Sequence, residues 1–179
     1  MSVTYQLLSF EPNAFAIECQ LQQERSDNGQ LSLNLAYCLT GDQSAIRYPE
    51  ASISPGRQWH LWEHSCFECF IATAGRPDYY EVNLSPSGDW NSYYFTDVRK
   101  HMQEAHNLGI TASDFSKDTR QARLSARLAF SHGSPDKYLE INLSAVIEGL
   151  NGDFHYFALA HALERPDFHC RKNFKRMDS

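Results

Sequence analysis

The chain has 179 residues, and its 16 lysines and arginines against 22 aspartates and glutamates give a formal net charge of -6 at pH 7. This acidic balance excludes a general affinity for nucleic acid, because binding to phosphates needs a basic face. Aromatic residues make up 13% of the chain, a composition too apolar for disorder, and the length suits a single domain over residues 1–179.

The first predicted element is a β-hairpin. Apolar residues alternate with polar ones over 14–21 and again over 31–39, which is the period-two pattern of half-buried strands. The segment SDNG at 26–29 lies between them, and its Asn28-Gly29 pair is able to adopt the positive φ angles that a tight hairpin turn needs.

Further strands follow in chain order, bounded by turn-forming residues. They are expected at 65–73, 78–85, 90–98, 121–131, 137–143 and 153–162. Residues 144–150 predict a short helix with Ser144 as its N-cap, and residues 99–107 a second, weaker one. Short strands at spacings near ten residues predict an all-β fold, an antiparallel β-sandwich or barrel with at most one or two short helices.

The cysteines and the beginning of the chain bear on its compartment. The beginning lacks a basic segment followed by an apolar core, so we expect no signal peptide, and no apolar run reaches the 18 residues of a membrane span. The five cysteines are then expected to be reduced thiols in the cytoplasm. Cys66 and Cys69 form a CxxC string, but residues three apart on a strand face opposite ways, so we expect no metal or redox site.

One block of the sequence concentrates both aromatic and acidic residues. Residues 59–95 hold ten of the 23 aromatics, including all three tryptophans. On the strand at 65–73, Glu68 is expected to share a face with Phe70 and Ala72, and on the strand at 78–85, Glu81 shares a face with Asn83. Such a face fits a ligand site with aromatic planes and carboxylates for hydroxyl groups. The alternative is an ordinary solvated sheet face with the aromatics in the core.

Three strings in this order resemble the signature of bacterial DOMON-like proteins, which are relatives of family 9 carbohydrate-binding modules. LWEHSCFECF at 61–70 is similar to LWExTCFExF, and YEVNLSPSGDW at 80–90 to YxEFNxSPSGxW. YFALAH at 156–161, followed by PDFH at 166–169, resembles the YWALxH…PDFH ending, with Phe157 in place of the usual Trp. Arg99 and Met102 stand where the family often has a short YR-x-GM segment.

The resemblance implies a DOMON-type or family 9 β-sandwich that binds a small molecule or a carbohydrate without catalysing a reaction. The candidate ligand-binding residues are aromatic planes for stacking and polar groups for hydrogen bonds. They are Trp62, Glu63, Glu68, Glu81, Asn83, Trp90, Tyr94, Arg99, His161, Asp167 and His169. No nucleic-acid or membrane partner is expected, and the sequence leaves the oligomeric state open.

Two alternatives remain open at this stage. Some DOMON branches bind haem b through an axial Met and an axial His, and the positions of matching order here are Met102 with His161 or His169. A hydrolase acting on a sugar derivative would use one of these histidines with Glu68 or Glu81, since paired carboxyls serve such chemistry. We favour a structural role over catalysis, in which Asp167 and His169 tie down the closing segment through hydrogen bonds, because no nucleophile or cofactor motif accompanies them.

Overall fold

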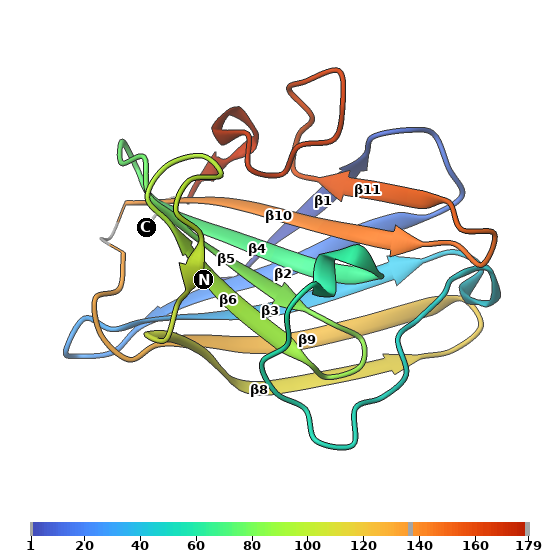
Figure 1. Cartoon of the computed structure of the whole chain (residues 1–179), viewed down its shortest axis with the longest axis horizontal. Coiled ribbons are helices and arrows are strands. Elements are labelled where there is room, and N and C mark those ends of the chain that lie inside the picture. The colour runs from blue at the N-terminus through green and yellow to red at the C-terminus, as the bar shows by residue number, and fades with distance from the viewer. Residues whose placement is uncertain (1, 136–137, 178–179) are drawn as a thin grey trace.

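The computed structural model describes residues 2–135 and 138–177, and within these ranges nearly all regular structure is antiparallel β-strand. Twelve strands join in one curled sheet (Figure 1), with three short 3-10 helices and no α-helix in the described residues. The strands are β1 (Ser2–Ser9), β2 (Ala16–Arg25), β3 (Leu31–Thr40), β4 (Cys66–Thr73), β5 (Tyr79–Leu84), β6 (Trp90–Phe95), β7 (Gln103–Glu104), β8 (Leu108–Lys117), β9 (Gln121–Phe130), β10 (Leu139–Glu148), β11 (Phe154–Ala158) and β12 (Lys175–Arg176). The 3-10 helices are η1 (Gln43–Ala45), η2 (Leu61–Glu63) and η3 (Arg171–Asn173). Over the described ranges, no helix has the length and apolar character needed to cross a membrane.

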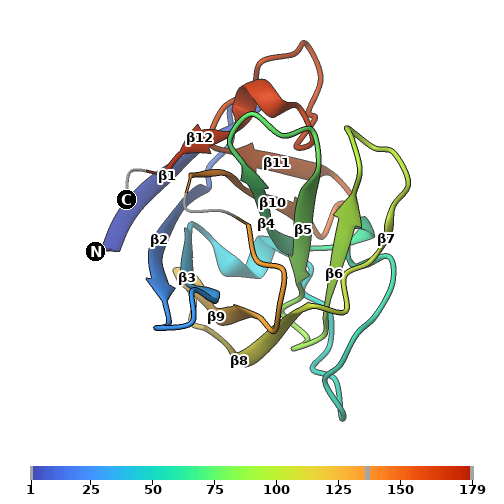
Figure 2. The same cartoon turned by 90° about the vertical axis from the view of Figure 1, so that its left-hand side faces the viewer.

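The sheet forms two layers that share strand β1. One layer has the order β1-β2-β3-β9-β8, and the other has the order β7-β6-β5-β4-β10-β11, with β12 beside β10. Residues 2–7 of β1 pair with β2, whereas Leu8 and Ser9 pair with β11, so β1 passes from the first layer into the second. Figure 2 looks along the strands and shows the layers curling around a common interior. The predicted antiparallel β-sandwich is confirmed.

Strands β2 and β3 form the predicted hairpin, paired from Ala16 opposite Thr40 to Arg25 opposite Leu31. The connection spans residues 26–30, which is longer than the tight turn expected from Asn28-Gly29. Gly29 alone of that pair has left-handed backbone, with a φ of 79°. The longer loop therefore needs the conformational freedom of glycine at one position only.

The two predicted helices are wrong. Residues 144–148 belong to strand β10, and residues 99–107 form a loop with the short strand β7. Strand β10 is covered on both faces, because Ala145 and Ile147 lie in the main core while Val146 packs on the opposite side. A strand buried on both faces loses the apolar alternation by which it is recognised. The predicted strand at 137–143 begins outside the described residues, since β10 is described from Leu139.

Besides the two-residue strands β7 and β12, two longer strands were not predicted, because neither carries the expected alternation. Strand β1 is largely exposed, and most of β8 is polar and exposed. Strand β9 does show the predicted pattern, with Ala122, Leu124, Ala126, Leu128 and Phe130 all buried. The alternation of apolar and polar residues thus identifies strands with one buried and one exposed face, and it misses strands that are mostly exposed.

Two apolar clusters lie on opposite faces of the second layer. The main core fills the space between the layers and includes Phe67 and Cys69 of β4 with Val82 of β5. The second cluster lies on the outer face and is covered by Phe168 and Phe174, which follow β11. Phe70 of β4 lies in this outer cluster, so the two faces predicted for the strand are confirmed. The outer face is therefore no solvated surface, and it carries the pocket described next.

Candidate functional site

A pocket of about 480 Å³ opens on the outer face of the second layer. The residues that line it come from η2, β4, β5, β6, β10 and β11, from the loop after β6, and from the segment after β11. They are Trp62, Glu68, Glu81, Phe95, Arg99, Met102, Val146, Tyr156, Pro166, Phe168 and His169. Most of these are apolar or aromatic, and the four polar groups converge from separate elements, which is the usual character of a small-molecule site.

Two glutamates lie at the base of the pocket on adjacent strands. Glu68 of β4 stands opposite Asn83 of β5, and Glu81 lies two residues before Asn83 on the same face. Both side chains are buried, with 3% of Glu68 and 5% of Glu81 exposed. The Ser144 hydroxyl donates to Glu68 Oε2 at 3.1 Å, and the Asn83 amide donates to Glu81 Oε1 at 2.9 Å. The pairing register of β4, β5 and β10 thus places the two carboxyls side by side.

Burial raises the pKa of both carboxyls. The pKa of Glu81 rises to about 7, mainly through loss of solvent, while the Asn83 hydrogen bond and the Arg99 charge act in the opposite direction. The pKa of Glu68 rises well above its ordinary value, first through burial and then through the neighbouring charge of Glu81. The pair therefore retains at least one proton at neutral pH, since two adjacent carboxylates in a dry site repel each other.

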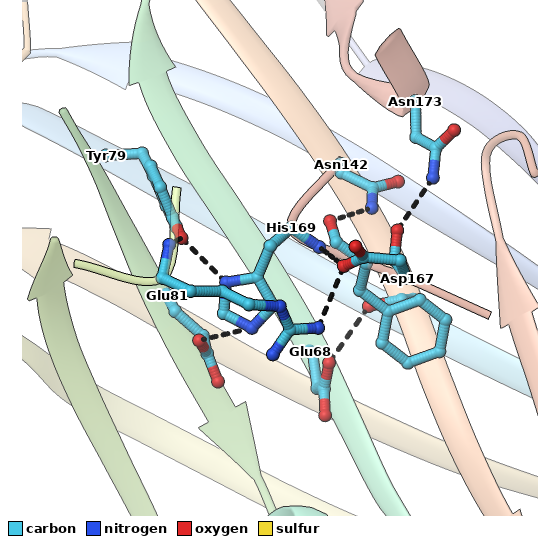
Figure 3. Close-up of polar contacts among 10 residues, drawn as sticks. Glu68, Tyr79, Glu81, Asn142, Asp167, His169 and Asn173 are labelled. Carbon is cyan, nitrogen blue, oxygen red and sulfur yellow. Dashed lines mark hydrogen bonds and ion pairs between the residues drawn. The ribbon is translucent and has the colours of Figure 1, made fainter. Parts of the chain in front are cut away.

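Arg99 lies beside the pocket and is held by the end of the chain. Its Nη2 donates to Asp167 Oδ1 at 2.8 Å, and the same carboxylate oxygen accepts the backbone N–H of His169 at 3.1 Å. The Asn142 amide donates to the Phe168 carbonyl at 3.0 Å, and the Asn173 amide donates to the Asp167 carbonyl at 2.9 Å. Figure 3 shows this network around Asp167 and His169. The network fixes residues 167–169 over the sheet, as expected for residues that tie down the chain end.

His169 projects into an enclosure of aromatic rings formed by Phe70, Tyr79 and Phe95. Its Nδ1 lies 2.6 Å from the Tyr79 hydroxyl, which already accepts the backbone N–H of Arg99 at 3.1 Å. The other ring nitrogen, Nε2, faces Glu81 Oε2 at 3.6 Å. Burial lowers the pKa of His169 to about 4, assisted by the Arg99 charge, so the ring is neutral at pH 7.

Backbone strain also concentrates around this pocket. His60, Arg99 and His101 have φ angles of 64°, 55° and 52°, and they are the only non-glycine residues of the described ranges in the left-handed region. Arg99 lines the pocket, and the other two lie within two residues of Trp62 and Met102, which also line it. Strained conformations of this kind cluster at functional sites, where the surrounding structure holds them in place.

Five of the eleven predicted ligand-binding residues line the pocket, as does Met102. They are Trp62, Glu68, Glu81, Arg99 and His169. Asp167 lies just behind them and anchors Arg99. The strings that resemble the DOMON-like signature thus contribute residues to one pocket, although these residues are up to about a hundred positions apart in the chain.

The other predicted residues lie elsewhere for identifiable reasons. Asn83 is fully buried beneath Glu81, and Glu63 is exposed beside His60. His161 Nε2 bonds to the Leu8 carbonyl at 2.8 Å, which ties the chain end to β1.

Trp90 and Tyr94 lie on the other face of β6 and pack against the main core. The Arg57 guanidinium covers the Trp90 ring, 4.3 Å from its centroid, and so takes the place that a stacked ligand would need. Tyr94 lines a different, more polar pocket of about 410 Å³, where its hydroxyl donates to Asp78 at 3.1 Å.

Sequence reasoning missed several pocket residues. Phe95, Val146, Tyr156, Pro166 and Phe168 line the pocket without having been predicted as ligand contacts. Tyr156 and the Pro166-Asp167-Phe168-His169 string belong to the terminal part of the family signature, so the sequence did contain a pattern that marks these residues. No pattern marks Val146, because its strand was predicted as a helix.

The residues of the pocket do not fit haem. An axial histidine needs a ring nitrogen that is free to face the iron, but His169 Nδ1 lies 2.6 Å from the Tyr79 hydroxyl and Nε2 faces Glu81 Oε2 at 3.6 Å. His161 uses Nε2 for the Leu8 carbonyl and does not line the pocket. Two carboxyl groups at the base also differ from the apolar environment that haem requires, so we do not carry the haem alternative further.

Comparison with solved structures gives two similar folds. A protein of Bacteroides uniformis ATCC 8492, described as a candidate carbohydrate-binding protein, aligns with 97% of this chain and 84% of its own, with a TM-score of 0.66 and 18% identity. A family 9 carbohydrate-binding module of Caldicellulosiruptor kristjanssonii, solved in complex with cellotriose, aligns with 86% of this chain and 72% of its own, with a TM-score of 0.50 and 7% identity. The chain has the fold of these proteins. No protein-family profile matches it, and no curated protein is detectably similar in sequence.

Proposed function

We propose that the chain is a non-catalytic binding domain for a sugar or a sugar-like metabolite, related to the DOMON-like proteins. The observation that carries this proposal is the pocket itself, in which the partly buried aromatic ring of Trp62 lines the same cavity as two buried carboxyls. Sugars combine apolar ring faces with outward hydroxyls, so they match an aromatic plane together with hydrogen-bond acceptors.

The signature blocks support the relationship to DOMON-like proteins. The first block supplies Trp62 and Glu68 to the pocket, the second supplies Glu81, and the last supplies Tyr156 with the Pro166–His169 string. The blocks meet at one pocket, which is expected if they record a shared ligand site. The solved structures of similar fold are consistent with sugar binding, since one is described as a candidate carbohydrate-binding protein and the other is a carbohydrate-binding module.

In the proposed complex, a sugar ring stacks on Trp62, and its hydroxyls donate to Glu68 and Glu81. Trp62 is fixed for this role because it packs edge-on against the buried Tyr93, with ring centroids 5.7 Å apart. Arg99 has further guanidinium donors besides the one directed at Asp167, and these are available to ring or hydroxyl oxygens. The strained backbone at Arg99 then serves to aim this side chain.

Binding is favoured over glycoside hydrolysis by the placement of the two carboxyls. Hydrolysis needs one carboxyl on each side of the scissile bond, and one of the two must be ionised. Glu68 and Glu81 instead rise from adjacent strands on one face, as diagonal neighbours roughly 7–8 Å apart at the backbone. Burial also raises the pKa of both groups, so neither carboxyl is held in the ionised form that a nucleophile or general base needs. A sugar resting on this base would meet both carboxyls from the same side.

The test is a glycan array followed by calorimetry with the best ligands. We expect Trp62→Ala and Glu68→Gln to weaken binding at least tenfold. The matched control is Phe154→Ala, which removes an exposed aromatic of the second layer outside this pocket. Equal binding by the wild type and Trp62→Ala, or no sugar ligand on the array, would contradict the proposal.

A further inference from the structure

The carboxyl pair at the base of the pocket has more hydrogen-bond acceptors than the protein fills. An ionised carboxylate accepts at about four lone-pair positions. In the described residues Glu68 receives one hydrogen bond, from Ser144 to Oε2, and its Oε1 receives none. Glu81 receives one from Asn83, and its second oxygen faces His169 Nε2 at the longer distance of 3.6 Å. Both side chains are nine-tenths or more buried, and both line the pocket.

The positive side chains around Glu68 and Glu81 do not neutralise the charge that the two carboxyls would carry if both were ionised. Among the residues that the structure describes, Arg99 is the only Lys or Arg that lines the pocket, and its Nη2 is paired with Asp167 rather than with either glutamate. The Arg99 side chain is 58% exposed, so solvent screens its charge more strongly than those of the buried glutamates. His169 is neutral, and Tyr79 and Tyr93, which face the same region, keep their protons because burial raises the pKa of both. Protons on the carboxyl pair therefore take the place of a missing cation.

The walls of the pocket are also suited to a cation. Trp62, Phe95, Tyr156 and Phe168 line it, and aromatic faces attract ammonium groups that lie within about 6 Å of them. A desolvated cation is stable only when it is paired with an opposite charge, and the base supplies that charge once a proton leaves. An apolar lining and an underfilled carboxyl pair thus occur in the same enclosure.

From this arrangement we propose that the ligand is an amino sugar, whose protonated amine sits on Glu68 and Glu81 while its ring stacks on Trp62. This inference rests on the proposed sugar-binding function and names the class of sugar. The ammonium group donates up to three hydrogen bonds, which matches the open acceptors of the pair. On binding, the O–H bond of one carboxyl breaks and its proton passes to solvent, the ammonium replaces its charge, and no bond between heavy atoms changes.

The experiment compares each amino sugar with its neutral and its acetylated counterpart by calorimetry. The probes are glucosamine, galactosamine and mannosamine, each beside its parent hexose and its N-acetyl form. Measurements at pH 6 keep the amine protonated, since comparable amines titrate near 8, while Glu81 with its pKa of about 7 remains mostly protonated in the free protein. Repeating them in buffers of different ionisation enthalpy counts the protons released.

We expect at least one amino sugar to bind about tenfold more tightly than both counterparts, the gain typical of a charge-assisted hydrogen bond. About one proton should be released on binding, as expected when a cation lowers the pKa of a carboxyl. Glu68→Gln and Glu81→Gln should abolish both the preference and the release. Asp114→Asn, which removes one negative charge from exposed β8, should change neither.

Two results would overturn the inference, and they are distinguishable. If an amino sugar and its parent hexose bind equally, and Trp62→Ala weakens both, the pocket binds neutral sugars and the proposed function stands. If no sugar binds in a way that depends on Trp62, the proposed function fails together with the inference.

Discussion

Replacing Glu81 by glutamine is expected to stabilise the fold at alkaline pH and to leave its stability unchanged near pH 4.5. Burial raises the pKa of Glu81 from its ordinary value of 4.5, which applies in an unfolded chain, to about 7 in the folded protein. Between these values the folded state binds more protons than the unfolded state. The free energy of unfolding therefore falls as pH rises from about 4.5 to 7, and stays at the lower level above that.

The size of the effect follows from the same pKa. One pKa unit corresponds to about 1.4 kcal/mol, so ionisation of the buried Glu81 lowers the free energy of unfolding by at most about 3.5 kcal/mol. Glutamine cannot ionise, and its carbonyl oxygen still accepts the hydrogen bond from Asn83 that Glu81 Oε1 receives. The variant should therefore gain up to about 3.5 kcal/mol over the wild type at pH 8 and nothing at pH 4.5.

Urea denaturation at half-unit steps from pH 4.5 to 8.5 measures this difference directly. Asp114→Asn provides the control, because it changes the net charge equally at an exposed position of β8. The difference between Glu81→Gln and the wild type should grow through pH 5–7, whereas the control should run parallel to the wild type. Parallel curves for Glu81→Gln and the wild type would refute the reasoning, because Glu81 would then ionise as freely as a solvated carboxylate.

The remaining predictions concern other parts of the account. Trp62→Ala should weaken sugar binding by about ten- to a hundredfold, as loss of a stacking aromatic does at binding hot spots, with Phe154→Ala unchanged in calorimetry. Arg57→Ala should lower the free energy of unfolding by about 3 kcal/mol or more, since it removes four hydrogen bonds, two to backbone carbonyls and two to side chains; denaturation within 1 kcal/mol of the wild type would contradict this. Gly41→Ala should destabilise the fold by about 1–3 kcal/mol, because φ is 135° and the added Cβ would lie 2.5 Å from Phe15 Cδ1; an unchanged melting temperature would disprove it.

The sequence was a good guide to the strands that have two different faces. Phe67 and Phe70 were assigned to opposite faces of β4 by alternation alone, and the structure places them in separate apolar clusters. Alternation is a local property of the strand, so it is readable from a single sequence. It failed for β10, because Ser144 and Val146 face a second apolar region rather than solvent.

The pocket was less predictable, because it depends on which distant segments meet. Trp62 and Trp90 were both predicted to stack on the ligand. Trp62 lines the pocket, whereas Trp90 packs against the main core and is covered by the Arg57 guanidinium. The sequence around Trp90 does not indicate that Arg57 covers it. The Arg57 guanidinium is placed by residues far from Trp90 in the chain, since it also donates to the carbonyls of residues 105 and 108. The cover formed by residues 166–169 is likewise set by long-range hydrogen bonds, such as that from Asn142 to the Phe168 carbonyl.

The measurement that tests the central claim most directly is a crystal structure with the tightest sugar from the glycan array. We predict the sugar ring against Trp62, with a donor group of the sugar within about 2.7–3.2 Å of the carboxyl oxygens of Glu68 and Glu81. A sugar bound elsewhere, for example in the polar pocket beside Tyr94, with the Glu68 and Glu81 carboxyls untouched, would contradict the account.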